Sequence, residues 1–186
     1  MNKEEVIIKL KSLNIDGMDN MIEFMLSNGF FESPASTKYH GCRDNGLLDH
    51  SVHLYKYYMA VIGKFKAITP NEFLDCPTDS DIFLCAMVHD FCKVGAYVKI
   101  AEGNYSYKTT HPKGHAMLSI DIVKKYIKLT SLQEAMIRFH MGYYGTHQFD
   151  INKGEYDIQA LRIAQNNRYV KLFYFADDTV SQFWDK

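Results

Sequence analysis

The side chains best suited to chemistry in this chain are a histidine and an aspartate that follow an apolar run. Residues 84–88 (LCAMV) are apolar enough to be buried, and they lead directly into His89 and Asp90, with Lys93 three residues further on. An ionised carboxylate is rarely buried unless it is paired or bound to a metal, because removing it from water costs several kcal/mol. The stretch therefore predicts a functional role for His89 and Asp90, together with other histidines and aspartates.

Further metal-ligand side chains fall at the ends or on the faces of expected helices. Single ligands on two helices, set opposite a His-Asp pair on a third, supply two nitrogens and two oxygens. Such a set suits Mn, Fe, Co, Ni, Zn or Mg rather than a metal selected by thiolates. An aspartate that bridges two ions, roughly 3.5–4 Å apart, would let them hold a hydroxide and clamp a phosphoryl group. The predicted ligands of one or two divalent ions are His50, His89, Asp90 as the bridge, His115, His140 and one of the adjacent Asp177 and Asp178.

Some of these residues also have a purely structural interpretation. His115 and His140 could each be a histidine that interacts with a helix end, and Lys93 could complement the dipole at the end of its helix. His111 lies near enough to His115 in the sequence to replace it as a ligand. The remaining histidines, His40, His53 and His147, are not expected to bind metal.

Helices are expected to position nearly all of the ligands. In residues 46–65 apolar side chains recur at steps of three and four, which places His50 at the edge of a core-facing stripe. Thr130 or Ser131 should cap a helix that ends at His140 or Met141, with Glu134 completing a capping box. The other helices are expected over residues 3–12, 18–27, 81–91, 115–128, 156–165 and 168–183. Residues 97–100 and 105–109 alternate around a turn at 102–104, which predicts a hairpin. The predicted class is all-α with one small β-hairpin.

Composition narrows the class of protein further. A chain of 186 residues that is 47% hydrophobic predicts one packed domain over residues 1–186. The net charge of −1 argues against a wholly basic surface for nucleic acid. The sequence has neither a secretory signal pattern nor an apolar stretch long enough for a membrane helix. The four cysteines lack CxxC spacing and are expected to be free thiols. We therefore expect a soluble, cytoplasmic protein without a membrane partner; the sequence carries no prediction of oligomeric state.

Several short motifs follow one another along the chain. They are NGLLDHS around His50, HDFCK from His89, GHAMLS at 114–119 and FADDTVS around Asp177. Together they resemble the patterns G-G-L-L-x-H-S/T, HD-x-x-K, G-H-x-x-x-S and A-D-x-x-S of the HD-domain metal-dependent phosphohydrolases. The resemblance covers about residues 35–182 and implies an HD-domain-like helical bundle. Cys92 departs from the small residue of the common HD-x-G-K form.

The resemblance also implies residue roles. The ligands of the first ion would be His50, His89, Asp90 and Asp177, the last selected over Asp178 by the A-D-x-x-S pattern. Members of the family with two further histidines, at positions like His115 and His140, commonly bind a second ion beside the bridging aspartate. Asp90 and Lys93 would be the catalytic residues, and Lys93 and Arg43 would contact the substrate phosphate.

The activity implied is hydrolysis of a phosphoester bond in a nucleotide or a small nucleic-acid-derived substrate, by attack of a metal-activated hydroxide on phosphorus. Nucleotidase, nucleoside-triphosphate hydrolase, cyclic-nucleotide phosphodiesterase and 3′-exonuclease on short RNA or DNA all fit this pattern. The near-neutral charge favours small nucleotides over polymers. The alternative of another class is a sensor that binds metal and nucleotide without turnover; the intact ligand set argues against it. A scaffold without a site is the third reading.

Overall fold

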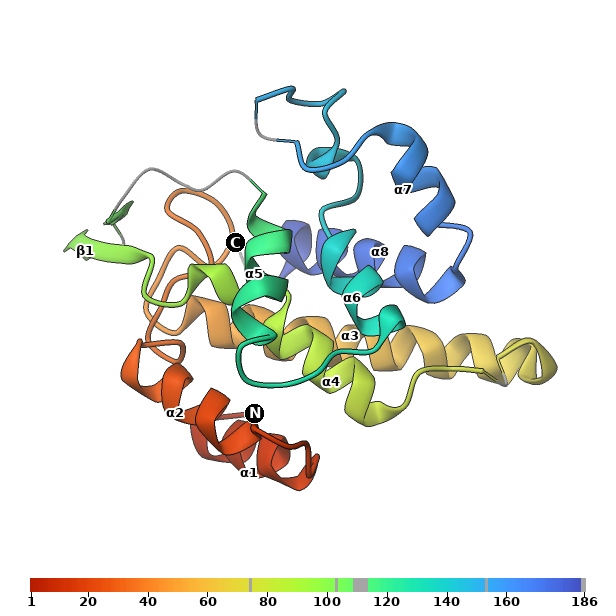
Figure 1. Ribbon diagram of the computed structural model, residues 1–186, viewed down its shortest axis with the longest axis horizontal. Helices are drawn as coiled ribbons and strands as arrows, with labels where there is room; N and C mark the ends of the chain where they lie inside the picture. Colours follow the sequence, from red (N-terminus) through yellow and green to blue (C-terminus); the bar gives the residue numbers. More distant parts are fainter. Residues whose placement is uncertain (74, 103, 109–113, 153, 185–186) are drawn as a thin grey trace.

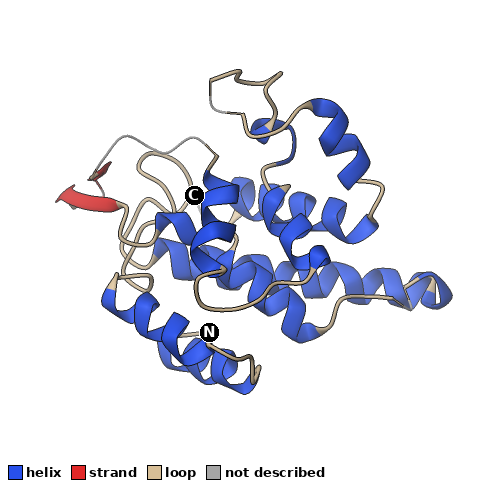
Figure 2. Ribbon diagram, viewed as in Figure 1, coloured by secondary structure: helices blue, strands red, loops and turns tan. Residues whose placement is uncertain are grey.

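The computed structural model describes residues 1–186 except 74, 103, 109–113, 153 and 185–186, and over the described residues the protein is mostly helical (Figures 1 and 2). The α-helices are α1 (Lys3–Ser12), α2 (Met18–Ser27), α3 (Gly46–Ile68), α4 (Asp79–Val88), α5 (His115–Val123), α6 (Ser131–Arg138), α7 (Ile158–Ala164) and α8 (Arg168–Phe183). The strands are β1 (Tyr97–Ala101) and β2 (Asn104–Tyr107), and the short 3-10 turns are η1 (Pro70–Glu72), η2 (Phe91–Lys93) and η3 (Gly142–Gly145). A mostly helical chain with one small hairpin was predicted, and this is confirmed.

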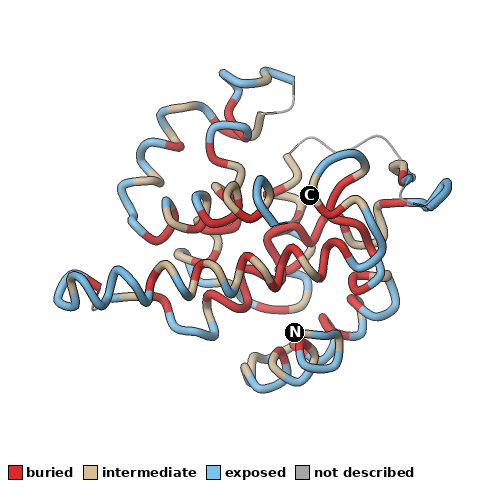
Figure 3. The backbone as a smooth tube through the Cα atoms, turned by 180° about the vertical axis from the view of Figure 1, so that it is seen from behind, coloured by how far each residue is buried: buried red, intermediate tan, exposed pale blue. Residues whose placement is uncertain are grey.

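Helix α4 is the most completely buried part of the region that leads to His89 and Asp90. Every residue from Ile82 to Val88 is buried, and α4 packs against α3, α5 and α6. Helix α8 in turn packs against α3 and α6. Figure 3 shows the buried backbone gathered where these helices meet. A helix that is apolar on all sides is typical of a protein core, so the apolar run before His89 becomes the element around which the others pack.

Capping boxes define the starts of α4 and α6 and also join the two helices. The Thr78 side chain accepts from the Asp81 amide, while the Asp81 carboxylate accepts from the Thr78 amide. Thr130 makes the same exchange with Gln133, so the predicted capping partner Glu134 was wrong by one residue. The Gln133 side-chain amide also donates to Asp81 Oδ1 at 2.8 Å. Because a single hydrogen bond links both caps, the positions of α4 and α6 depend on each other.

Three helices end earlier than the sequence predicted, and residues of the predicted site lie just past two of those ends. Helices α4, α5 and α6 end at Val88, Val123 and Arg138, not near residues 91, 128 and 140. Past the end of α4, the Cys92 amide donates to Ser119 Oγ of α5, at 3.0 Å, instead of to a helical carbonyl. Asp90 is left between α4 and η2 with φ −106° and ψ 26°. The segment that follows α4 is therefore held by a side chain 27 residues away.

The predicted hairpin forms, with its second strand over Asn104–Tyr107, and it is fastened to the loop that precedes α3; residues 103 and 109 of the prediction lie outside the described residues. Strands β1 and β2 pair antiparallel, with Tyr97 opposite Tyr107. Lys99 of β1 and Tyr105 of β2 lie opposite each other, and the Lys99 ammonium and the Tyr105 hydroxyl both donate to the Asp44 carboxylate. The loop that carries His40 and Arg43 is thereby held against the hairpin.

In the part of the chain that the structure describes, no helix is both long and apolar enough to cross a membrane. The four cysteines are free thiols, as predicted, and Cys85 and Cys92 are buried.

Candidate metal centre

The six predicted ligands come from five separate segments and converge on one buried region. His50 lies in the second turn of α3, and Asp177 lies in the middle of α8. His89 and Asp90 follow α4, His115 is the first residue of α5, and His140 lies two residues past the end of α6. The packing of α3, α5 and α6 against α4, and of α8 against α3 and α6, brings these segments together. Five of the six are buried, and the His115 side chain is 15% exposed.

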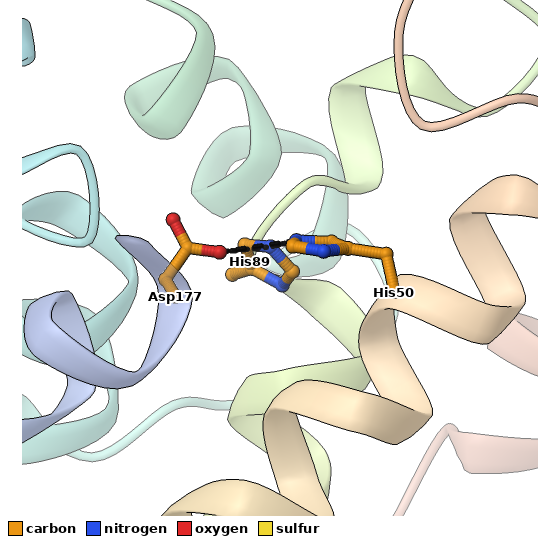
Figure 4. Close-up of side chains that lie close together, drawn as sticks. All are labelled: His50, His89 and Asp177. Carbon is orange, nitrogen blue, oxygen red and sulfur yellow. Dashed lines mark hydrogen bonds and ion pairs between the residues drawn. The ribbon is translucent and has the colours of Figure 1, made fainter. Parts of the chain in front are cut away.

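The first group consists of His50, His89 and Asp177, which Figure 4 shows pointing toward one another. His50 Nε2 lies 3.0 Å from Asp177 Oδ1 and 3.1 Å from His89 Nε2. His89 Nε2 lies 3.6 Å from the same carboxylate oxygen. Two imidazole nitrogens and a carboxylate oxygen at this spacing could hold a metal ion.

The second group consists of His89, Asp90 and His140, with His115 beside them. Asp90 Oδ1 lies 3.3 Å from His115 Nε2 and 3.6 Å from His140 Nε2. The two imidazole nitrogens of that pair are 3.3 Å apart. The other oxygen, Asp90 Oδ2, lies 3.3 Å from His89 Nε2. The carboxylate of Asp90 thus presents one oxygen to each side, which is the arrangement that a bridging ligand needs.

The orientation of two of the imidazoles is set by backbone carbonyls. His89 Nδ1 lies 2.9 Å from Ala86 O, and His140 Nδ1 lies 2.6 Å from Ile137 O. A carbonyl oxygen can only accept, so we infer that Nδ1 carries a proton in both rings. Both Nε2 atoms then face the cluster. A metal-binding histidine commonly donates its other ring N–H to a carbonyl in this way, which fixes the orientation of the ring.

Charge makes the cluster a poor structural core without a cation. Burial lowers the pKa of His89, which favours its neutral ring, and the unprotonated Nε2 then faces oxygens of Asp90 and Asp177. The Oδ1 atoms of both carboxylates are buried and have no well-aligned hydrogen bond from the described residues, although imidazole nitrogens lie 3.0–3.6 Å from them. A lone pair facing two buried anions is unfavourable. A divalent cation would satisfy the imidazole nitrogen and both orphaned oxygens, so the residues present fit a metal.

The acid–base properties of the neighbouring ligands agree with this. Burial alone would raise the pKa of both carboxyls, but Lys93 and the imidazoles hold the pKa of Asp90 well below its usual range, and His50 does the same for Asp177. Burial opposes protonation of His140, yet Asp90 and Asp177 raise its pKa. The carboxylates therefore remain anionic and attract positive charge to the centre of the cluster.

The two predicted substrate-binding residues have different surroundings. Lys93 is buried, and its Nζ lies 2.6 Å from Asp90 Oδ2, at the edge of the cluster. Arg43 is half-exposed and forms an ion pair with Asp49, the residue before His50. The phosphate-binding role of both residues stays a prediction.

One residue that the sequence did not select lies against the cluster. The His40 ring is 5.0 Å from the His50 ring, centre to centre, and burial with nearby positive charge lowers its pKa to about 4. His40 belongs to a loop without hydrophobic periodicity, so no pattern marked it. The sequence signal that could have found it is the pair of glycines Gly41 and Gly46. A Cβ on Gly46 would lie 2.0 Å from the Gly41 carbonyl oxygen, so the loop can close onto α3 only because Gly46 has no side chain. The alternative ligand His111 lies outside the described residues.

Comparison of the chain with protein-family models, with curated proteins and with solved structures finds no match in any of the three. The fold and the site define a mostly helical protein with buried histidine and aspartate groups that could hold a metal ion.

Proposed function

We propose that this protein is a metal-dependent phosphohydrolase of the HD-domain type, with an HD-domain-like helical bundle and a nucleotide or small nucleotide-derived phosphoester as substrate. The observation that carries the proposal is the carboxylate of Asp90. It is buried, its Oδ1 atom has no well-aligned hydrogen bond from the described residues, and its two oxygens face His89 on one side and His115 with His140 on the other. The resemblance of the short motifs supports the reaction class.

In this proposal His50, His89, Asp90 and Asp177 hold a first ion, and Asp90, His115 and His140 hold a second. Bound divalent ions would act as Lewis acids and lower the pKa of a water molecule for attack on phosphorus. The protein contributes the fixed positions of the ligands. The carbonyls of Ala86 and Ile137 orient two of the imidazoles, which limits reorganisation when substrate binds.

The charges of the site favour an anionic substrate once metal is bound. With neutral imidazoles, Asp90 and Asp177 contribute two negative charges and Lys93 one positive charge, a sum of −1. One divalent ion changes this sum to +1, and two change it to +3. A phosphoester would then be attracted to the centre, with the Lys93 ammonium as a further positive charge beside it.

Small nucleotides are favoured as the substrate class over polymers. A protein binds long nucleic acid through many lysines and arginines that neutralise phosphates and release counterions. This chain has a net charge of −1 and so lacks an excess of positive charge. The basic residues assigned to the substrate phosphate, Lys93 and Arg43, suffice for a single phosphoester.

The test combines metal analysis with a substrate panel. The purified protein is loaded with Mn²⁺, Co²⁺, Ni²⁺, Zn²⁺ or Mg²⁺, and its metal content is measured by elemental analysis. Each form is then incubated with ribo- and deoxynucleotides, cyclic dinucleotides and short RNA, and the released phosphate, pyrophosphate or triphosphate is identified. We expect at least one bound ion and metal-dependent release from a nucleotide.

The Asp90→Ala variant is the control, and we expect it to lose both metal and hydrolysis. A metal-replete, active Asp90→Ala protein refutes the assignment. Nucleotide binding without turnover by every metal form would identify a sensor, and a wild-type protein that binds no metal would leave the scaffold interpretation.

A further inference from the structure

The N-terminal end of α5 is capped by a side chain from a distant loop. The carboxylate of Glu155 accepts from the amides of Ala116 and Met117, at 2.9 and 3.1 Å. The residue at the N-cap position, Gly114, has φ +77° and offers no side chain. Glu155, 39 residues from Ala116 in the sequence, therefore does the work of an N-cap. A carboxylate at this end of a helix is stabilised by the helix dipole and by charge-assisted hydrogen bonds.

The helix that Glu155 caps begins with a predicted ligand of the second ion. His115 immediately precedes the two capped amides, and its Nε2 lies 3.3 Å from Asp90 Oδ1. One turn further on, Ser119 Oγ donates to the His115 carbonyl at 3.1 Å and accepts from the amide of Cys92. Hydrogen bonds therefore fix the backbone around His115 in two places: Glu155 binds the two amides that follow it, and Ser119 binds its carbonyl.

The loop that presents Glu155 also starts at the other histidine of the second ion. Its first residues follow His140, and its end is fastened back on its beginning. The Glu155 amide donates to the Gly145 carbonyl at 2.8 Å, and the Tyr156 hydroxyl donates to the Gly142 carbonyl at 2.8 Å. A Cβ on Gly145 would lie 2.3 Å from that hydroxyl, so a larger residue would push the two ends apart. One closed loop therefore connects the position of His140 to that of His115.

We propose that Glu155 is a positioning residue for the second metal ion: it holds the start of α5 so that His115 stays within reach of Asp90 and His140. The inference rests on the proposed function, because it needs a second ion at these residues. The Glu155 carboxylate is bonded to the two amides at the start of α5, whereas the ligands of the first group, His50, His89 and Asp177, lie on α3, after α4 and on α8. Its loss should weaken the second ion and leave the first unchanged.

The experiment measures stepwise metal binding by calorimetry with Mn²⁺, on the full chain, for Glu155→Ala and Glu155→Gln. Loss of a residue that orients a metal ligand typically costs 10–100-fold in affinity. We expect this loss for the second ion in Glu155→Ala, with an unchanged first Kd. Glutamine keeps one acceptor oxygen, so Glu155→Gln should retain part of the affinity.

Asp157→Asn is the matched control, because Asp157 lies on the same loop and its carboxylate caps α7, through the Ala160 amide, where Glu155 caps α5. It should bind both ions as the wild type does. Thermal unfolding of the metal-free variants identifies any general loss of fold, and Glu155→Gln keeps the test available if Glu155→Ala does not fold.

The outcomes separate this inference from the proposed function. Equal weakening of both ions, or an unchanged second ion in Glu155→Ala, overturns the positioning role. A wild-type protein that binds only one ion also overturns the role of Glu155, but it leaves the proposed function intact as a hydrolase with one ion. A wild type that binds two ions but hydrolyses no nucleotide contradicts the proposed function and leaves the role of Glu155 to be decided by the same titration.

Discussion

Replacing Asp90 by asparagine removes one negative charge from the centre of the site while nearly keeping the shape of the side chain. The Asp90 side chain is 4% exposed, and Lys93 Nζ lies 2.6 Å from it with a side chain that is 11% exposed. In the variant the Lys93 ammonium faces an amide that cannot carry the balancing charge. The substitution therefore affects metal binding and the stability of the metal-free protein through different partners.

The expected loss of stability follows from the buried ion pair. Removing one partner of such a pair and leaving the other charge uncompensated costs about 3–5 kcal/mol. For a chain of this size each kcal/mol corresponds to about 2–4 °C, so the melting temperature of the chelated protein should fall by about 6–20 °C. Metal content should fall as well, because both proposed ions lose Asp90 as their shared ligand.

A double variant separates the two effects. In Asp90→Asn combined with Lys93→Met both charges are absent, and replacing a whole buried pair is often close to neutral. We expect the chelated double variant to regain most of the stability, to within about 1–2 kcal/mol of the wild type. It should still lack metal. Urea unfolding in a chelator and elemental analysis after metal loading give the two measurements.

Two results would refute this reasoning. Wild-type metal content in Asp90→Asn would show that Asp90 is not a shared ligand. A double variant no more stable than Asp90→Asn would show that the unpaired Lys93 ammonium is not the source of the loss.

Three further predictions follow from other residues. Asp177→Asn should lose bound metal, measured by elemental analysis, whereas Asp178→Asn should keep it; equal metal content would contradict the choice of Asp177 as ligand. Burial and nearby positive charge lower the pKa of His40 from 6.5 to about 4, so the folded state binds fewer protons than the unfolded state between these values. The chelated protein should therefore lose about 3 kcal/mol of stability as the pH falls from about 6.5 to about 4, relative to His40→Gln. Urea unfolding at several pH values measures this, and the same change in the free energy of unfolding with pH in both proteins would count against it. Burial raises the pKa of the thiols of Cys85 and Cys92, the latter to about 12. Neither should react with iodoacetamide at pH 8 until urea is added, and peptide mass spectrometry that finds Cys92 labelled in the folded protein would contradict this.

Features whose cause lies within a few residues could be predicted from the sequence. The stripe in residues 46–65 predicted α3, and the alternation around 102–104 predicted the hairpin between Tyr97 and Tyr107. The capping residue Thr130 was correct, although its partner is Gln133 and not Glu134. The types of the ligands were also readable, because a histidine and an aspartate after an apolar run are costly unless they have partners.

The ends of the helices and the surroundings of the ligands depended on residues far away in the chain. Past the end of α4 at Val88, Ser119 accepts from the amide of Cys92, and nothing in residues 84–95 marks that interaction. His40 reaches the cluster only because its loop closes onto α3. Glu155 caps α5 only because a second loop folds back on itself.

The sequence by itself determined the helical class, the starts of the helices to within two residues and which side chains are suited to a metal site. Only the tertiary structure decided that Asp90 presents one oxygen to His89 and the other to His115 and His140, and that Glu155 lies at the head of α5. The physical reason is the range of the interactions. Periodicity and capping act within one or two turns of a helix. The positions of side chains from five segments are instead set by the packing of α3, α5 and α6 against the buried helix α4 and of α8 against α3 and α6.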